Sequence, residues 1–185
     1  MTFMLPTKQL TTISKFISLV LRHKPETIGL TLDPFGWAGT TELIDKMNSN
    51  GKAITFQILE YVVATNSKKR FAFNSDKTKI RASQGHSLAV DLQLQPVKPP
   101  IQLYHGTSVQ FVSSILKTGL QKRGRQHVHL SPDKETAMSV GRRHGKPAVL
   151  LVDAAKMEED GFAFYLSENK VWLTESVPAK YLSLL

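Results

Sequence analysis

The sequence predicts an α+β protein built from two lobes. Three observations support this: apolar residues recur at helical spacing in the N-terminal part, short alternating segments dominate the C-terminal part, and a proline-rich stretch separates them. The chain has 185 residues, of which 41% are hydrophobic, so it can bury two small cores. The predicted lobes span residues 1–95 and residues 96–185.

Three helices are predicted in the first lobe. Apolar residues at helical spacing indicate a helix over residues 8–24, which Pro25 ends. Thr40 or Thr41 can cap a second helix and Thr55 can cap a third, because a threonine hydroxyl can accept a hydrogen bond from the first backbone N–H groups of a helix.

After the third helix the spacing changes from helical to alternating. Residues 70–73 and 78–81 flank a turn of asparagine, serine and aspartate, and they predict a β-hairpin. Three helices followed by a two-stranded wing are typical of a winged helix, a common nucleic-acid-binding form. A further turn is predicted at residues 33–37, where aspartate, proline and glycine occur close together.

The second lobe begins after an extended linker that contains Pro96, Pro99 and Pro100. Strands and helices are mixed beyond the linker. The expected strands are residues 102–104, 127–130, 148–152, 162–166 and 171–174, and the expected helices are residues 109–118 and 134–143.

The net charge favours a partner that carries phosphate groups. The chain has 24 Lys and Arg residues against 15 Asp and Glu residues, a net charge of +9 and a pI near 9.8. That balance fits RNA, DNA or a phosphorylated cofactor without choosing among them. The absence of cysteine excludes disulfides and thiolate chemistry and fits a cytoplasmic location. Neither an apolar run of membrane-spanning length nor a secretory signal is visible.

Arg22, His23 and Lys24 lie side by side at the end of the first predicted helix. Cations at a helix C-terminus interact favourably with the helix dipole, which alone would explain them. The same dipole tends to keep His23 protonated, and a protonated histidine beside a guanidinium group can receive a phosphate and later donate a proton. Arg70 alternates with two phenylalanines, so packing of the phenyl rings would fix its direction.

A motif of tyrosine, histidine, glycine and threonine, Tyr104 to Thr107, ends the first predicted strand of the second lobe. Gly106 would let a ligand approach the backbone, and the side chains of His105 and Thr107 offer hydrogen bonds.

Arg125, His127 and His129 would share one face of the next predicted strand, because side chains alternate between the two faces of a sheet. The spacing of the two histidines also fits a metal site. The lack of cysteine and the scarcity of nearby carboxylates argue against a metal.

Seven segments follow one another along the chain: SKFISLVLRHKPETIGLTLD, KKRFAF, IRASQGHS, LYHGTS, HVHLS, VGRRHGKP and NKVWLT. In this order and spacing they closely resemble the RNA 2′-phosphotransferase family, whose members are best known for removing the splice-junction 2′-phosphate from tRNA with NAD. The resemblance extends from about Ser14 to the C-terminus, and the chain looks like a bacterial member.

The resemblance implies an N-terminal winged-helix lobe that binds RNA and a C-terminal lobe of the ADP-ribosyltransferase type that binds NAD. It places the catalytic set of the family on Arg22, His23, Arg70 and Arg125, in a cleft between the lobes. None of the four residues is substituted.

Contacts with NAD are also implied by the resemblance. His105 would hold the NAD ribose and His129 would stack on nicotinamide, whereas His86 would be structural or near the RNA. The full set expected to bind NAD, with no metal ion, is Tyr104, His105, Gly106, Thr107, His129, Ser131 and Asp133.

The activity implied by the resemblance has two steps. The RNA 2′-phosphate first attacks the anomeric carbon of the nicotinamide ribose and expels nicotinamide, which joins ADP-ribose to the RNA. The neighbouring 2″-hydroxyl then attacks phosphorus, so that RNA leaves with a 2′-hydroxyl and ADP-ribose 1″,2″-cyclic phosphate is formed. Guanidinium groups would stabilise the charge that develops on phosphorus.

Other functions stay open for the sequence. The chain could ADP-ribosylate a terminal phosphate on DNA or RNA, or a protein. It could also be a winged-helix regulator without catalytic activity whose second lobe senses NAD, although a sensor would not need the intact Arg-His-Arg-Arg set. The expected partner is an RNA with an internal 2′-phosphate, such as a tRNA, and the expected oligomeric state is a monomer.

Overall fold

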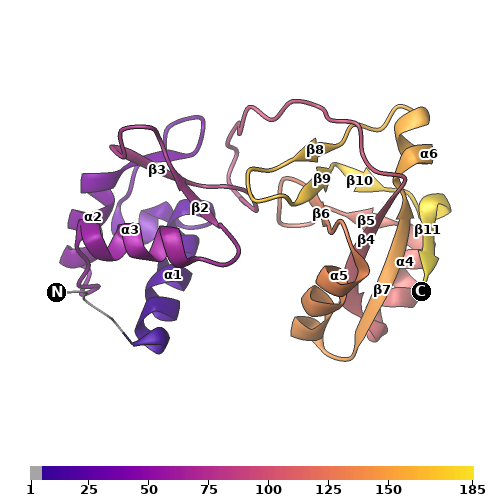
Figure 1. The fold of residues 1–185 in the computed structure, drawn as a ribbon, viewed down its shortest axis with the longest axis horizontal. Coiled ribbons are helices and arrows are strands. Elements are labelled where there is room, and N and C mark those ends of the chain that lie inside the picture. The colour runs from indigo at the N-terminus through magenta and orange to yellow at the C-terminus, as the bar shows by residue number, and fades with distance from the viewer. Residues whose placement is uncertain (1–5) are drawn as a thin grey trace. The chain divides into compact units, whose positions relative to one another are not determined.

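The computed structural model describes residues 6–185 (Figure 1). The expectation that the N-terminus carries no secretory signal rests partly on residues 1–5, which lie outside this range. The chain separates into two compact units between Gln93 and Leu94, and each unit is described by itself. Among residues 6–185, none of the helices combines the length and the apolar character that crossing a membrane requires.

The first unit contains helices and a small antiparallel sheet of order β1-β3-β2, whose first strand precedes α2. The sheet includes the predicted hairpin, formed by β2 and β3, which is confirmed. Its elements are α1 (Thr7–Arg22), the 3-10 helix η1 (Pro25–Ile28), β1 (Trp37–Gly39), α2 (Thr40–Ser49), α3 (Phe56–Thr65), β2 (Phe71–Phe73) and β3 (Lys79–Ala82).

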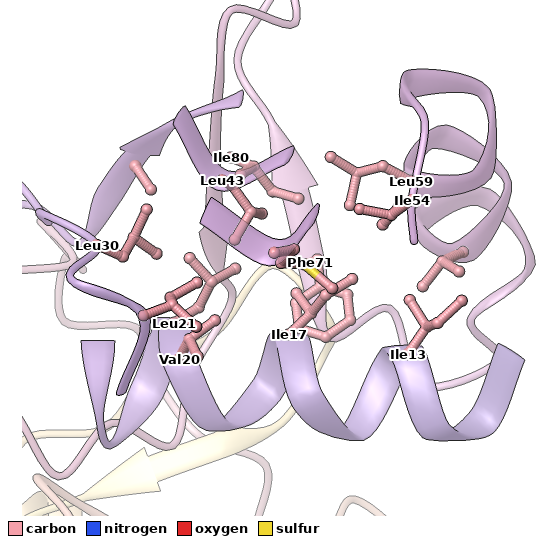
Figure 2. Packing of buried hydrophobic residues seen from close by; sticks show 14 of the residues in the cluster. Ile13, Ile17, Val20, Leu21, Leu30, Leu43, Ile54, Leu59, Phe71 and Ile80 are labelled. Atoms are coloured by element: carbon pink, nitrogen blue, oxygen red, sulfur yellow. The ribbon is translucent and has the colours of Figure 1, made fainter. Parts of the chain in front are cut away.

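One apolar core holds these elements together (Figure 2). Ile17 and Leu21 point from α1 toward Leu43 of α2, Phe71 of β2 and Ile80 of β3, and all five are buried. Full burial of a side chain of this size stabilises the folded state by roughly 1.5–3 kcal/mol relative to exposure in water. The helical spacing in the sequence therefore has its expected physical basis.

The two predicted threonine caps have different outcomes. Thr55 caps α3, because its side chain accepts a hydrogen bond from the backbone N–H of Ile58 at 3.3 Å. The prediction for the second helix is wrong: Gly39 is the N-cap of α2, and Thr40 is already its first helical residue. Thr40 instead donates its hydroxyl proton to the carbonyl oxygen of Lys77 at 2.8 Å, which ties the start of α2 to the hairpin.

The second unit consists of three antiparallel sheets and three α-helices. The strand orders are β11-β7-β4, β6-β9-β8 and β10-β5. Its elements are β4 (Gln102–Ser108), α4 (Val109–Thr118), β5 (Leu120–Gln121), β6 (Val128–Leu130), α5 (Lys134–Gly141), η2 (Arg142–His144), β7 (Pro147–Asp153), α6 (Ala154–Glu159), β8 (Tyr165–Leu166), β9 (Trp172–Thr174), β10 (Ser176–Val177), η3 (Ala179–Tyr181) and β11 (Leu182–Leu184).

The long pairing of β4 with β7 is the centre of the second unit. Leu103 of β4 and Leu150 and Val152 of β7 are fully buried, in a core that also receives Phe164. The mixed helix and strand content predicted for this part of the chain is confirmed, and the sequence missed only short elements such as α6 and β11. Strand β4 runs through the whole motif from Tyr104 to Thr107.

Candidate active site

Arg22 and His23 lie at the C-terminal end of α1. Arg22 is the last helical residue, and His23 is the C-cap, whose backbone N–H donates to the carbonyl oxygen of Leu19 at 2.9 Å. Both side chains are half-buried. Two basic side chains therefore lie beside the negative pole of the helix dipole.

Ser87 closes this end of α1 from a distant part of the chain. Its backbone N–H donates to the carbonyl oxygen of Arg22 at 3.0 Å, and its hydroxyl oxygen lies 3.0 Å from Nδ1 of His23. The last carbonyl groups of a helix have no partner within the helix, so Ser87 supplies one.

Arg70 lies directly before β2, within reach of Arg22. Nη2 of Arg22 donates to the backbone carbonyl oxygen of Arg70 at 3.3 Å. The same carbonyl oxygen accepts the backbone N–H of Ser83 at 2.9 Å. Three of the four predicted catalytic residues thus come from two adjoining places in the first unit.

Asn66 shapes the turn that leads to Arg70. Its Oδ1 accepts from the backbone N–H of Lys68 at 3.1 Å and of Arg70 at 3.5 Å, and its Nδ2 donates to the hydroxyl of Ser14 on α1 at 3.1 Å. Lys69, in the same turn, has a φ of 41°, which residues other than glycine rarely adopt. The asparagine therefore anchors a strained turn to the helix that ends in Arg22.

His86 is fully buried directly before Ser87. Among residues 6–185, neither of its ring nitrogens has a hydrogen-bond partner. Burial, together with the positive charges of Arg22, His23 and Arg81, lowers the pKa of His86 to about 4. The imidazole is therefore neutral near pH 7, and it lies inside the unit rather than at its surface.

Strand β4 of the second unit carries Tyr104, His105, Gly106 and Thr107. Tyr104 and Ser131 exchange two backbone hydrogen bonds, from the tyrosine N–H at 3.0 Å and from the serine N–H at 2.7 Å. The segment that follows β6 therefore runs beside this motif. Thr107 is buried, whereas Tyr104, His105 and Ser131 are half-buried.

His105, His129 and Arg125 form a second connected group. Nδ1 of His105 lies 3.1 Å from the carbonyl oxygen of His129, and a carbonyl can only accept, so this nitrogen carries a proton. Nη1 of Arg125 lies 3.1 Å from Nδ1 of His129, and a guanidinium can only donate, so Nδ1 of His129 carries none. Arg125 itself is exposed and lies in the turn before β6.

Burial lowers the pKa of His105, and the positive charges of His144 and Arg125 lower it further, against the effect of its hydrogen bond to His129. His105 is therefore neutral near pH 7 and presents Nε2 as a hydrogen-bond acceptor. His127 does not join this group through its ring, which packs against Tyr165 with centroids 5.7 Å apart.

Gly106 and Asp133 have structural tasks that the sequence did not indicate. A Cβ atom at Gly106 would lie 1.7 Å from the carbonyl oxygen of Ala137, so the missing side chain makes room for helix α5. Asp133 caps α5 by accepting the backbone N–H of Thr136 at 2.6 Å and its hydroxyl at 2.9 Å. That either residue contacts NAD stays a prediction.

Sequence reasoning missed two residues that organise the first group, Asn66 and Ser87. Asparagine after a helix is typical of a turn, which is only a general signal. Ser87 lies in the segment IRASQGHS, but nothing in the sequence connects it with His23, which is 64 residues away.

Each unit of this mixed α and β protein brings arginine and histidine residues together, in a chain with a net charge of +9, and this combination is typical of proteins whose ligands carry phosphate groups. The model of the RNA 2′-phosphotransferase, Tpt1 / KptA family matches residues 8–176. The chain therefore belongs to this family, and the resemblance seen in the sequence is confirmed.

Individual relatives match nearly the whole chain. The "Probable RNA 2′-phosphotransferase" of Flavobacterium johnsoniae is 59% identical over 170 residues, which is 92% of this chain and 93% of the relative. Proteins with the same name from Fusobacterium nucleatum and Rhodopirellula baltica are 56% and 55% identical, covering 92% and 95% of this chain and 96% of each relative.

Proposed function

We propose that the chain is an NAD-dependent RNA 2′-phosphotransferase. Family membership and the names of its relatives support transfer of an RNA 2′-phosphate. The observation that carries the proposal is that the guanidinium group of Arg22 donates to the backbone carbonyl oxygen of Arg70, while His23 follows Arg22 at the end of α1. Guanidinium groups match the geometry of phosphate oxygens, and a neighbouring imidazolium adds charge and a transferable proton.

RNA binding is assigned to the first unit, which we interpret as a winged helix. Three α-helices followed by the hairpin of β2 and β3 support this interpretation, with β1 completing the small sheet. The second unit is assigned to NAD binding, as an ADP-ribosyltransferase-like fold. The support there is the grouping of His105, His129 and Arg125 around neighbouring strands.

The polarity of the second group fits a dinucleotide that offers ribose hydroxyls. Neutral His105 would accept a hydroxyl proton at Nε2, because its Nδ1 proton is already used on the carbonyl oxygen of His129. Arg125, held at the Nδ1 atom of His129, would contact the reacting ribose or the transferred phosphate. NAD would then serve as a co-substrate that accepts the phosphate.

In the first proposed step, an oxygen of the RNA 2′-phosphate bonds to the anomeric carbon of the nicotinamide ribose, and the bond to nicotinamide breaks. The phosphate is already ionised near pH 7, so this step does not need a general base. Arg22 and Arg70 would orient the phosphate through their guanidinium groups.

In the second step, the 2″-hydroxyl oxygen bonds to phosphorus and the bond to the RNA 2′-oxygen breaks. The hydroxyl releases one proton and the departing RNA oxygen gains one, which protonated His23 can donate. Charge builds on phosphorus in this transition state, where fixed guanidinium donors are most effective. RNA leaves with a 2′-hydroxyl, and ADP-ribose 1″,2″-cyclic phosphate is the other product.

The test is incubation of the protein with NAD and a short RNA that carries one internal 2′-phosphate, followed by mass spectrometry of all products. Nicotinamide, RNA with a 2′-hydroxyl and ADP-ribose 1″,2″-cyclic phosphate are expected, and a metal chelator should not abolish their formation. Phosphate removal that continues without NAD would overturn the proposal. ADP-ribose attached only to terminal phosphates would identify the alternative acceptor.

A further inference from the structure

Ser87 contacts the end of α1 through both its backbone and its side chain. The backbone N–H donates to the carbonyl oxygen of Arg22 at 3.0 Å. The hydroxyl oxygen lies 3.4 Å from the same carbonyl oxygen and 3.0 Å from Nδ1 of His23. One exposed serine thus touches two of the residues proposed to handle the phosphate.

The chemistry of these atoms favours one position for the hydroxyl proton of Ser87. The carbonyl oxygen of Arg22 can only accept, so the hydroxyl hydrogen of Ser87 is directed to it. The lone pairs of the hydroxyl oxygen then face Nδ1 of His23, which must carry a hydrogen to make this contact favourable. In a neutral histidine the remaining nitrogen, Nε2, is consequently unprotonated.

We propose that Ser87 is a positioning residue for His23, which holds the Nδ1–H tautomer so that Nε2 is the nitrogen that takes up and delivers a proton. The proposal rests on the proposed function, because it names the atom of His23 that would serve the departing RNA oxygen. Which imidazole nitrogen carries the proton is generally set by the hydrogen bond that the other nitrogen makes.

The backbone around Ser87 is held by packing as well as by these hydrogen bonds. The side chain of His86, the preceding residue, is fully buried. It lies close to Gly36, where a Cβ atom would come within 3.5 Å of Nε2 of His86. Further along, the N–H of Asp91 donates to the carbonyl oxygen of Pro34 at 2.8 Å. Replacing the exposed Ser87 side chain should therefore leave the path of the chain intact.

The first measurement is the tautomer of His23 in the full chain, from long-range ¹H–¹⁵N spectra at a pH where this histidine is neutral. The spectrum of His23→Gln assigns the signal. The parent protein should show a protonated Nδ1 and an unprotonated Nε2. The opposite tautomer in the parent protein would overturn the proposal without any variant at Ser87.

The second measurement compares Ser87→Ala, which removes the hydroxyl, with Ser87→Thr, which keeps it. Ser87→Ala should lose the fixed tautomer and lower kcat about tenfold or more, with a smaller change in KM for RNA, by analogy with the partners that orient metal-binding histidines, whose loss typically costs about that much. Ser87→Thr should keep most of the fixed tautomer and most of the parent kcat. Ser75→Ala, at an exposed position in the hairpin turn, is the matched control and should change neither.

The outcomes separate this proposal from the proposed function. An unchanged tautomer in Ser87→Ala, or a changed tautomer with unchanged kcat, would overturn the role of Ser87. A parent protein without activity on 2′-phosphate RNA would overturn the proposed function instead, and the spectra would still decide whether Ser87 sets the tautomer. Thermal unfolding of each variant shows whether lost activity reflects lost folding.

Discussion

Nη2 of Arg22 donates to the backbone carbonyl oxygen of Arg70 at 3.3 Å, although the two residues are 48 positions apart. One candidate catalytic side chain therefore helps to place the main chain of another. Replacing Arg22 should remove a charge and also loosen Arg70, so the two residues should not act independently. In a double-mutant cycle, Arg22→Ala and Arg70→Ala together should cost less than the sum of the single changes.

The first prediction separates the two chemical steps. Arg22→Ala, His23→Ala and Arg70→Ala should each slow the second step more than the first, because the second transition state carries more charge. Removal of one preorganised donor typically costs on the order of 3 kcal/mol in such a transition state. The RNA joined to ADP-ribose through its 2′-phosphate should then accumulate in time courses with labelled RNA, whereas the parent protein should show little of it.

Two further variants serve as controls for this prediction. Arg22→Lys should recover only part of the rate, because an ammonium group cannot make the bidentate contact of a guanidinium. Lys46→Ala, in helix α2, should leave both steps near the parent rates. Slower substrate loss in all three alanine variants without any visible intermediate would show that the residues act in binding or in the first step.

The second prediction concerns the turn that carries Arg70. Asn66→Ala removes the acceptor of the Lys68 and Arg70 N–H groups and the donor to Ser14. Unfolding free energy should fall by about 1–3 kcal/mol, and kcat should fall although every proposed catalytic side chain is still present. Asn66→Asp keeps the acceptor oxygen and should therefore lose less unfolding free energy and less kcat. Asn50→Ala, an exposed helix-end asparagine, is the control.

The third prediction tests why position 106 is glycine. Gly106→Ala should destabilise the second unit by about 3 kcal/mol or more, since its Cβ atom would meet backbone that cannot move aside as a side chain can. Gly124→Ala is the matched control, because a Cβ atom there would meet nothing within 4 Å. Denaturant unfolding, followed by Trp172 fluorescence in a Trp37→Phe background, measures the unfolding free energy of both variants. Equal stability of the two variants would contradict the packing explanation.

Local signals in the sequence predicted the elements that are long or clearly ended. Helix α4 was expected at residues 109–118 and occurs there, because Gly119 ends it with a φ of 80°. Strand β1 was missed because three residues show no periodicity and its partner strand, β3, lies far along the chain. Helix α6 has only six residues, and its cap by Asp153 gave only a weak signal.

For the candidate site, the sequence identified kinds of residues but not their contacts. Arg22 and His23 stood out as cations at a helix end, and Arg70 through its alternation with phenylalanine. The hydrogen bonds that organise them join residues 48 to 65 positions apart, which no local pattern can reveal. The packing of helix α5 against Gly106 could not be predicted for the same reason, because the helix approaches it only in the folded chain.

The fourth prediction concerns pH and the buried His86. Its pKa is about 4 in the folded protein and near 6.5 when unfolded, so between these values the unfolded chain binds more protons and stability falls as the pH falls. The variant His86→Leu removes the contribution of this histidine to the pH dependence of stability. The unfolding free energy of the variant, relative to that of the parent protein, should rise by up to about 3 kcal/mol as the pH drops from about 6.5 to about 4.

Urea unfolding at several pH values, followed by Trp37 fluorescence in a Trp172→Phe background, reports on the first unit. His144→Gln, an exposed change in the second unit, should leave this pH dependence as it is in the parent protein. A stability difference between His86→Leu and the parent protein that stays constant across the range would show that His86 is not neutral and buried as described.

The last prediction distinguishes two tasks of His129. Its ring is expected to stack on nicotinamide, and its Nδ1 atom accepts a hydrogen bond from Arg125 at 3.1 Å. His129→Phe keeps an aromatic ring and loses the acceptor, whereas His129→Asn keeps an acceptor near the same place and loses the ring. His129→Phe should therefore lower kcat by about tenfold to a hundredfold, the loss expected for a hydrogen bond to a charged group, with little change in KM for NAD. His129→Asn should raise KM for NAD and keep more of kcat.

His127→Phe, which preserves the ring contact with Tyr165, serves as the control. If His129→Phe and His129→Asn lose the same parameter to the same extent, His129 has one task only, and the hydrogen bond that it accepts from Arg125 does not contribute to catalysis.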